Sequence, residues 1–138
     1  MKKVLTGGCF DMLHYGHISF LSEAKKHGDW LVVALESDEN VRRMKGHTRP
    51  IHSQVQRKAM LESLRFVDEV IALPSMHTDE EYAKLVADVA PSVIALTEGD
   101  GMEDKKRRHA ATVGAAVVVI PKIHTPSTSQ LAKLVGLE

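Results

Sequence analysis

The 138-residue chain has no excess of charge of either sign and few aromatic side chains. Eighteen lysines and arginines balance eighteen aspartates and glutamates, so the overall charge indicates no attraction to nucleic acid or to an anionic membrane surface. Three phenylalanines, two tyrosines and one tryptophan leave little for the base-stacking surfaces of single-strand binders. The composition therefore argues against a nucleic-acid-binding module.

The sequence also lacks disulfides, linkers and membrane spans. Its one cysteine, Cys9, cannot form an internal disulfide, which is typical of a reducing compartment. We find no leader-like segment, no apolar run long enough to cross a bilayer, no repeat and no linker rich in Pro, Gly or Ser. We therefore expect one soluble, cytoplasmic domain over residues 1–138, with no membrane partner.

Short apolar runs alternate with helical patterns along the whole chain. The runs show no in–out alternation, which predicts strands buried on both faces of a parallel sheet. Strands are expected at Val4–Leu5, Leu31–Leu35, Glu69–Leu73, Ser92–Leu96 and Ala115–Ile120. Helices are expected at His17–His27, Glu39–Met44, Ser53–Arg65, Asp79–Ala90, Glu103–Val113 and Ser127–Val135. This order predicts a Rossmann-like, doubly wound α/β fold with a five-stranded parallel sheet, in which ligands bind beyond the carboxyl ends of the strands.

The stretch 7–17 joins the first expected strand to the first expected helix. Glycines let a bulky anion approach the backbone, and a helix N-terminus supplies unpaired N–H groups and the positive end of a dipole. His14 and His17, three residues apart, would project toward the same side of the first turn. The pattern predicts a phosphate site with two proton or charge donors, although it also fits a glycine-rich turn with polar capping histidines. Gly28 is expected to cap the end of this helix.

These residues carry a family resemblance. Gly8-Cys9-Phe10-Asp11 followed by His14-Tyr15-Gly16-His17 resembles the signature of the cytidylyltransferase-like nucleotidyltransferases, whose hallmark is HxGH. The resemblance extends in unbroken order over about the first half of the chain, through the segments 28–34, 37–39, 45–46, 49–50, 56–57 and 67–70. It implies the nucleotidyltransferase fold of the HIGH superfamily. Within the family, the chain resembles glycerol-3-phosphate, phosphoethanolamine and phosphocholine cytidylyltransferases and the heptose-phosphate adenylyltransferase.

The resemblance implies catalytic roles for three residues. It implies that His14 and His17 bind the triphosphate and stabilise the charge that develops at the α-phosphorus. It places Lys45 at the triphosphate and the acceptor phosphate, although most lysines of this kind are simply solvated. His14-x-x-His17 also resembles a zinc-ligand spacing, but no third ligand stands nearby in the sequence, so we expect no protein-bound metal.

The resemblance also implies a set of nucleotide-binding residues. These are Gly8, Cys9, Phe10, Asp11, Arg57, Gly99, Asp100, Lys122, Ser127, Thr128 and Ser129. Asp11 is expected to face the site and support the metal–nucleotide, and Ser127-Thr128-Ser129 to hold the β- and γ-phosphates. Ordinary alternatives are a helix cap for Asp11 or Ser127 and an exposed helix position for Arg57. Cys9 is interpreted as a small packing residue beside the pocket rather than a nucleophile.

The sequence departs from the cytidylyltransferase pattern where the base is read. Lys122 stands in the stretch where those enzymes carry an arginine, and the acidic motif after the fourth strand, at Thr97–Gly101, is displaced along the chain. The run Lys105–Arg108 is most simply a solvated helix face, with an anionic acceptor as the alternative.

We therefore expect transfer of CMP from CTP to a small phosphorylated alcohol such as glycerol 3-phosphate or phosphoethanolamine, with release of pyrophosphate. The sequence around His14 is closest to that of the ethanolamine-phosphate relatives. In contrast, the motif Lys45-Gly46-x-x-Arg49-Pro50 is closest to that of the heptose-phosphate adenylyltransferases. The alternative is therefore transfer of AMP from ATP to heptose phosphate or to flavin mononucleotide. An alternative of another class is a nucleotide-binding regulator without turnover. Mg²⁺ is expected to accompany the nucleotide, and the resemblance implies a homodimer.

Overall fold

Five parallel strands form one sheet in the computed structural model, which describes residues 1–123, 125 and 128–136. The strands are β1 (Lys3–Gly8), β2 (Trp30–Leu35), β3 (Glu69–Ala72), β4 (Val93–Thr97) and β5 (Ala116–Ile120). Their spatial order is β3-β2-β1-β4-β5, so β1 is central: Val4 pairs with Leu31 of β2 on one side and with Val93 of β4 on the other. The predicted five-stranded parallel sheet is confirmed.

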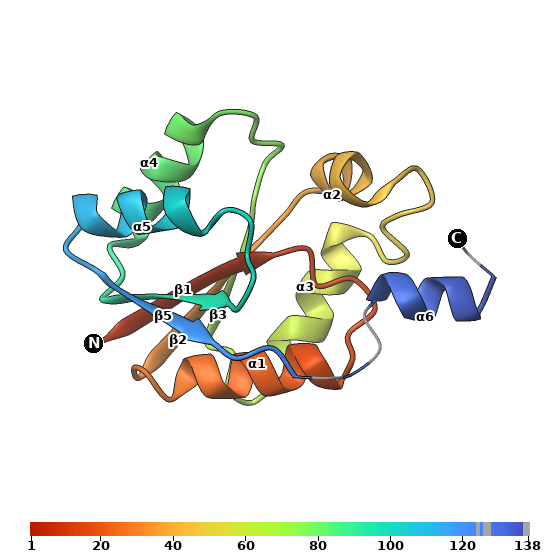
Figure 1. Ribbon diagram of the computed structural model, residues 1–138, viewed down its shortest axis with the longest axis horizontal. Coiled ribbons are helices and arrows are strands. Elements are labelled where there is room, and N and C mark those ends of the chain that lie inside the picture. Colours follow the sequence, from red (N-terminus) through yellow and green to blue (C-terminus); the bar gives the residue numbers. More distant parts are fainter. Residues whose placement is uncertain (124, 126–127, 137–138) are drawn as a thin grey trace.

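Helices cover both faces of this sheet (Figure 1). They are α1 (Tyr15–Lys25), α2 (Asp38–Lys45), α3 (Gln54–Glu62), α4 (Asp79–Val89), α5 (Glu103–Thr112) and α6 (Thr128–Leu134). Residues of α1 and α3 pack in the core cluster of one face, and residues of α4 and α5 in that of the other. In the described part of the chain, no helix combines the length and the apolar character that a membrane crossing requires. The predicted helices are all present, and the expected start at Ser127 lies outside the described residues.

The sheet holds the two core clusters together because its strands are apolar on both sides. In β2, Leu31, Val33 and Leu35 pack into the cluster under α1 and α3, whereas Val32 and Ala34 pack into the cluster under α4 and α5. All five are buried. Burying such an aliphatic side chain contributes about 1.5–3 kcal/mol. Apolar and polar residues do not alternate along β2 because each face of this strand packs into a different core cluster.

Side-chain caps fix where several helices begin near the carboxyl edge of the sheet. Ser37 Oγ accepts from Asn40 N at 3.1 Å and starts α2. Ser53 starts α3 with a reciprocal pair, in which Gln56 N donates to Ser53 Oγ at 3.3 Å and Ser53 N donates to Gln56 Oε1 at 3.1 Å. Each cap of this kind contributes about 1 kcal/mol. The caps therefore anchor the segment that carries Lys45.

Gly28 does not cap α1 in the way its position predicts. The helix cap is Lys26, in right-handed conformation, and Gly28 is not among the residues of positive φ. A Cβ at Gly28 would instead lie 2.5 Å from the carbonyl oxygen of Lys2, which accepts hydrogen bonds from Asp29 N and Trp30 N. The glycine is needed because the turn into β2 passes directly against the start of β1.

We predict that Gly28→Ala destabilises the protein by about 1–3 kcal/mol, because a backbone oxygen must move to admit the methyl group. Thermal unfolding should show a lower Tm than that of the unchanged protein. Gly101→Ala is the matched control, since a Cβ there meets nothing within 4 Å. Equal Tm values for the two variants would contradict the explanation.

Candidate functional site

A cavity of about 870 Å³ opens at the carboxyl edge of the sheet. It extends from the β1–α1 elbow past the end of α2 to the β3–α4 connection, α5 and the segment after β5. Its size is in the range of small-molecule and cofactor sites. The residues predicted from the sequence that line it are Gly8, Cys9, Phe10, Asp11, His14, His17, Lys45, Asp100, Lys122 and Ser129.

Four predicted residues are not placed in this cavity. Arg57 and Gly99 do not line it. Ser127 lies outside the described residues, and so does the side chain of Thr128, whose backbone begins α6. The structure therefore brings together both histidines, Lys45 and most of the elbow, as the strand–helix order predicts.

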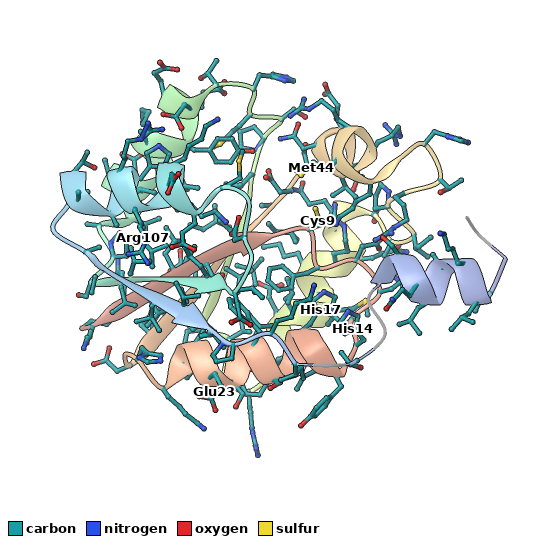
Figure 2. The ribbon with its side chains drawn as sticks, in the orientation of Figure 1. Cys9, His14, His17, Glu23, Met44 and Arg107 are labelled. Atoms are coloured by element: carbon teal, nitrogen blue, oxygen red, sulfur yellow. The ribbon has the colours of Figure 1, made fainter. Side chains whose placement is uncertain are left out.

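His14 and His17 form a stacked pair at the start of α1. Their ring centroids lie 3.9 Å apart with an interplanar angle of 29°. Gly16 N donates to His14 Nδ1 at 3.0 Å, and His14 N donates to His17 Nδ1 at 3.2 Å. Figure 2 shows the two side chains next to each other, near Cys9. The histidines therefore cap their own helix, which was the ordinary alternative, and line the cavity at the same time.

Gly16 makes this double role possible. A Cβ at Gly16 would lie 2.8 Å from His14 Cε1 and 3.0 Å from His14 Nδ1. Gly8 has a similar function, since its Cβ would lie 2.9 Å from the Phe10 ring. The sequence pattern predicted that these glycines leave room for an anion. In the structure, they first leave room for the side chains that shape the elbow.

The hydrogen bonds of the pair determine its tautomers. A ring nitrogen that accepts a hydrogen bond carries no proton, so the neutral form of each imidazole has its proton on Nε2. Both rings therefore hold one N–H group that their own helix does not use. Two N–H donors at a helix N-terminus suit the oxygens of a phosphate group.

Burial keeps both rings neutral near pH 7. Burial lowers the pKa of His17 to about 4, with the adjacent His14 and the cation of Lys45 acting in the same direction. Burial also lowers the pKa of His14. The pair is thus a hydrogen-bond donor rather than a fixed positive charge. Lysines and arginines also line the cavity, namely Arg43, Lys45, Arg49, Lys105, Lys106 and Lys122, of which Arg49 and Lys106 are paired with Asp11 and Asp100.

Cys9 lies at the elbow with its thiol protonated. Burial raises the pKa of this thiol, and the opposing effect of nearby cations, Lys45 first among them, is smaller. A thiol with a raised pKa is a poor nucleophile. The structure therefore agrees with the interpretation of Cys9 as a packing residue beside the cavity.

Asp11 is engaged by the protein itself. Its side chain is 0 % exposed and accepts from Arg49 Nε at 2.8 Å, from Ile51 N at 2.7 Å and from His52 N at 3.1 Å. Burial alone would raise the pKa of Asp11, but these hydrogen bonds outweigh it and hold the pKa below its usual value. Asp11 thus supports the elbow, and its expected role beside a metal–nucleotide stays a prediction.

Arg57 is a second support of the elbow. Its side chain is 0 % exposed; it donates to Asp38 Oδ1 at 2.7 Å, to the carbonyl oxygen of Cys9 at 2.7 Å and to that of His52 at 3.0 Å. The ordinary alternative, an exposed helix position, is therefore wrong. That Arg57 lies near the phosphates stays a prediction, and its contact with Cys9 places it behind the elbow rather than in the cavity wall.

Three cavity residues were missed by the sequence analysis. Arg49 belongs to the quoted Arg49-Pro50 motif, which was a signal, but no role was assigned to it. Glu36 and Tyr82 carry a polar contact inside the cavity, in which the Tyr82 hydroxyl donates to Glu36. No local pattern marks this contact, because the two residues are separated by 46 positions.

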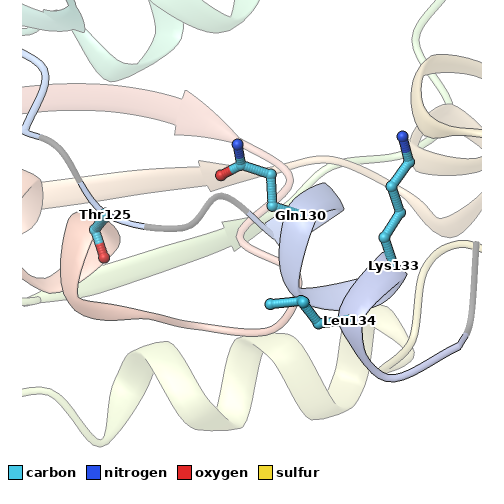
Figure 3. Close-up of a pocket in the computed structure, with 4 residues that line it drawn as sticks. All are labelled: Thr125, Gln130, Lys133 and Leu134. Atoms are coloured by element: carbon cyan, nitrogen blue, oxygen red, sulfur yellow. The ribbon is translucent and has the colours of Figure 1, made fainter.

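A second hollow, of about 510 Å³, lies beside α6 (Figure 3). It is lined by Thr125, Gln130, Lys133 and Leu134, and among these only Lys133 is charged. It therefore lacks the combination of imidazoles, cations and helix N-terminus that marks the larger cavity as the candidate active site.

The described residues offer no ready-made metal site. They contain no group of three or more His, Cys, Asp or Glu side chains that could hold an ion. The carboxylate nearest the histidines in sequence, Asp11, is held by Arg49 and two backbone N–H groups. A cation that enters the cavity with a nucleotide would thus take most of its ligands from phosphate and water, as Mg²⁺ commonly does.

We predict that His17 titrates near pH 4 in the folded protein and near its ordinary value of 6.5 when unfolded. Between these values the unfolded state binds more protons, so the free energy of unfolding contributed by His17 rises with pH and is complete above about 6.5. An NMR titration of the imidazole signals would give the midpoint, and urea unfolding of His17→Gln should show a smaller pH slope than the unchanged protein. A midpoint for His17 at or above 6.5 would contradict the assignment of neutral, Nε2-protonated rings.

Comparisons with known proteins agree with this geometry. The chain matches the family described as cytidylyltransferase-like over residues 5–131. It is 39% identical over 117 residues to the bifunctional protein HldE of Campylobacter jejuni serotype O:2, covering 85% of this chain and 23% of that protein. It is 46% identical over 93 residues to the bifunctional protein HldE of Pasteurella multocida, covering 67% of this chain and 19% of that protein. The chain thus spans about a quarter or less of the length of these curated relatives.

A solved structure gives the same result. The lipopolysaccharide core biosynthesis protein of Thermoplasma volcanium superposes with a TM-score of 0.70 at 29% identity, covering 91% of this chain and 98% of that one. The HxGH elbow, the sheet order and the sequence match therefore lead to one conclusion: the chain belongs to the cytidylyltransferase-like family of nucleotidyltransferases.

Proposed function

We propose that the chain transfers AMP from ATP to the phosphate group of a sugar phosphate, with release of pyrophosphate. The observation that carries the transfer chemistry is the neutral, stacked pair His14–His17, with both Nδ1 atoms engaged, at the mouth of a cavity lined with cations. The choice of ATP over the CTP expected from the sequence is supported by the similarity to the HldE proteins.

The acceptor is supported by two findings. The motif Lys45-Gly46-x-x-Arg49-Pro50 is closest to that of the heptose-phosphate adenylyltransferases. The similar protein from Thermoplasma volcanium is described as a lipopolysaccharide core biosynthesis protein. Lipopolysaccharide cores are built from sugars, which favours a sugar phosphate such as heptose phosphate over a phosphorylated alcohol. Flavin mononucleotide and the phosphorylated alcohols belong in the panel of acceptors that tests this.

The reaction needs positioning and charge stabilisation more than proton transfer. A phosphate oxygen of the acceptor forms a bond to the α-phosphorus, the bond from that phosphorus to the bridging oxygen of the β-phosphate breaks, and pyrophosphate leaves with the electron pair. Negative charge accumulates on the non-bridging and leaving oxygens. Preorganised N–H donors stabilise that charge without rearrangement, and such stabilisation commonly lowers the barrier more than any other single effect.

Different residues of the cavity contact the nucleotide phosphates and the acceptor phosphate. The Nε2–H groups of His14 and His17 donate to oxygens around the α-phosphorus, while their Nδ1 atoms keep accepting the backbone hydrogen bonds of the elbow. Lys45, at the end of α2, is exposed at the rim and lines the same cavity, so its flexible ammonium group can follow the acceptor phosphate. A Mg²⁺ ion held by the triphosphate and water would neutralise part of the phosphate charge.

Pyrophosphate release measured with ATP and with CTP, across a panel of phosphorylated acceptors, tests the proposal. We expect the highest kcat/KM with ATP and a sugar phosphate. A preference for CTP with glycerol 3-phosphate or phosphoethanolamine would return the assignment to cytidylyl transfer. Tight nucleotide binding without pyrophosphate release from any acceptor would identify a nucleotide-binding regulator.

Replacing either histidine of the pair should lower kcat by about 10²–10³-fold, the usual cost of one preorganised donor. His14→Asn and His17→Asn are the informative variants, because asparagine is a good helix cap and retains an oxygen that accepts from the helix N–H groups. His47→Asn is the matched control, since His47 is exposed and does not line the cavity. Unchanged turnover in folded His14→Asn and His17→Asn proteins would refute the mechanism.

The homodimer stays a prediction from the resemblance, and the cytoplasmic location stays a prediction from the cysteine content and the lack of a leader-like segment. Light scattering of the purified protein would measure the first, and fractionation of cells the second.

A further inference from the structure

Glu36 is a buried carboxylate at the centre of the candidate site. It follows β2 directly, is 8 % exposed and lines the cavity. Its backbone N–H donates to the carbonyl oxygen of Gly8 at 3.1 Å, which fixes it beside the β1–α1 elbow. A negative charge this close to a triphosphate site needs an explanation, because it repels the phosphates.

Glu36 differs from the other carboxylates of the cavity in its partners. Asp11 is paired with Arg49, Asp100 with Lys106 at 2.6 Å, and Asp79 lies 3.0 Å from His109 Nε2. In contrast, no ion pair of Glu36 is found among the residues that the structure describes.

Two neutral side chains hold the carboxylate in place. The Tyr82 hydroxyl donates to Glu36 Oε1 at 3.0 Å and to Oε2 at 2.9 Å, and Asn40 Nδ2 donates to Oε1 at 3.4 Å. Asn40 is 0 % exposed and is itself held by the carbonyl oxygen of Met76 at 3.0 Å. Burial and the adjacent carboxylate raise the pKa of Tyr82, so its hydroxyl stays a donor.

The cluster of Glu36, Tyr82 and Asn40 has more acceptors than donors. A carboxylate has about four lone-pair sites, and one hydroxyl proton and one amide proton cannot fill them. Asn40 Oδ1 is buried with no hydrogen-bond partner among the described residues. Glu36 lines the cavity and Asn40 does not, so the remaining lone pairs of the Glu36 carboxylate are the acceptors that a ligand with N–H or O–H groups can reach.

The surroundings of the cluster favour a hydroxyl-rich ligand. The cavity wall around it includes Leu73, Met76, Leu85 and Val86, which suits the C–H faces of a sugar. Lys45 lines the same cavity and provides a cation for a phosphate group on that ligand. A sugar phosphate combines these features.

The position of Glu36 in the sheet indicates the acceptor rather than the nucleotide. Glu36 follows β2, whereas Asp100 and Lys122, which the family resemblance assigns to the nucleotide, follow β4 and β5. In the order β3-β2-β1-β4-β5 these lie on opposite sides of the β1 elbow. The reacting phosphorus at the elbow would therefore lie between the nucleotide and a ligand at Glu36.

We propose that Glu36, oriented by Tyr82 and Asn40, accepts hydrogen bonds from adjacent hydroxyl groups of the acceptor sugar and selects hydroxylated acceptors. This inference rests on the proposed function for the reaction, and it adds the residues that recognise the acceptor substrate. Glu36 is the specificity-determining residue, and Tyr82 is a positioning residue that acts through it.

Glu36→Gln should raise the KM for heptose phosphate about 10- to 100-fold, the usual effect of losing hydrogen bonds to a charged group, while the Kd of ATP changes less than twofold. Tyr82→Phe, which leaves the carboxylate but removes its fixed donor, should raise the same KM by a smaller factor with little change in kcat. Glu39→Gln is the matched control, because Glu39 is exposed on α2 and does not line the cavity. Monodeoxy analogues of heptose phosphate should lose affinity for the unchanged protein and lose less for Glu36→Gln.

Direct binding separates this inference from the proposed function. Calorimetric titration of heptose phosphate into the unchanged protein and Glu36→Gln needs no turnover, so it measures the site even if no pyrophosphate is released from ATP. Weaker binding to Glu36→Gln alone supports the inference, and equal binding to both overturns it. A Kd difference for ATP that disappears with 2′,3′-dideoxy-ATP would assign Glu36 to the nucleotide ribose instead. A loss confined to phosphoethanolamine would assign it to an amine, and either result overturns the proposal.

Discussion

The buried contact between Asp11 and Arg49 is the constraint on which the site depends. Asp11 lies in the elbow after β1, and its carboxylate binds Arg49 and the N–H groups of Ile51 and His52, which lie in the connection between α2 and α3. Both ionic side chains are almost completely buried, and removing one partner of such a pair typically costs about 3–5 kcal/mol. One carboxylate thus joins the segment that carries the histidines to the segment that follows Lys45. The relative position of the histidine pair and of the segment that follows Lys45 is therefore set by this buried contact.

The elbow that Asp11 holds determines what the histidines can do. With both Nδ1 atoms accepting backbone hydrogen bonds, His14 and His17 present only Nε2–H, and burial keeps both rings neutral near pH 7. Two cations stacked at this distance would repel each other, and the empty site would be destabilised. Neutral donors avoid that repulsion, and the glycine at position 16 is what allows the first ring to fold back onto the helix. The HxGH pattern is therefore a packing requirement and a chemical one together.

The sequence could predict the sheet, the helices and the main members of the site, because these depend on local periodicity and on the order of strands. Each apolar run of the sequence became a strand, and the elbow lies at the carboxyl edge as the order requires. The errors concern long-range contacts. Gly28 was assigned to a helix cap because its role depends on Lys2, just before β1, and the burial of Arg57 was missed because its partners Cys9 and Asp38 belong to other segments of the fold. Burial of a charged side chain depends on distant partners that no local pattern records.

The contrast between Glu36 and its neighbours explains how such a site can change its acceptor without losing its chemistry. At position 36 the contact with the elbow is made by the backbone, because Glu36 N donates a hydrogen bond to Gly8 O. Any residue except proline has the N–H group that this hydrogen bond requires. The side chain is then available for recognition, whereas Asp11 and Gly16 are fixed by the elbow that they build. Tyr82 comes from α4, an element that contributes nothing to the histidine pair. The histidine pair thus lies on the β1–α1 elbow, whereas the proposed acceptor contacts come from the end of β2, from α2 and from α4, so most of the side chains of the two sets can be substituted separately.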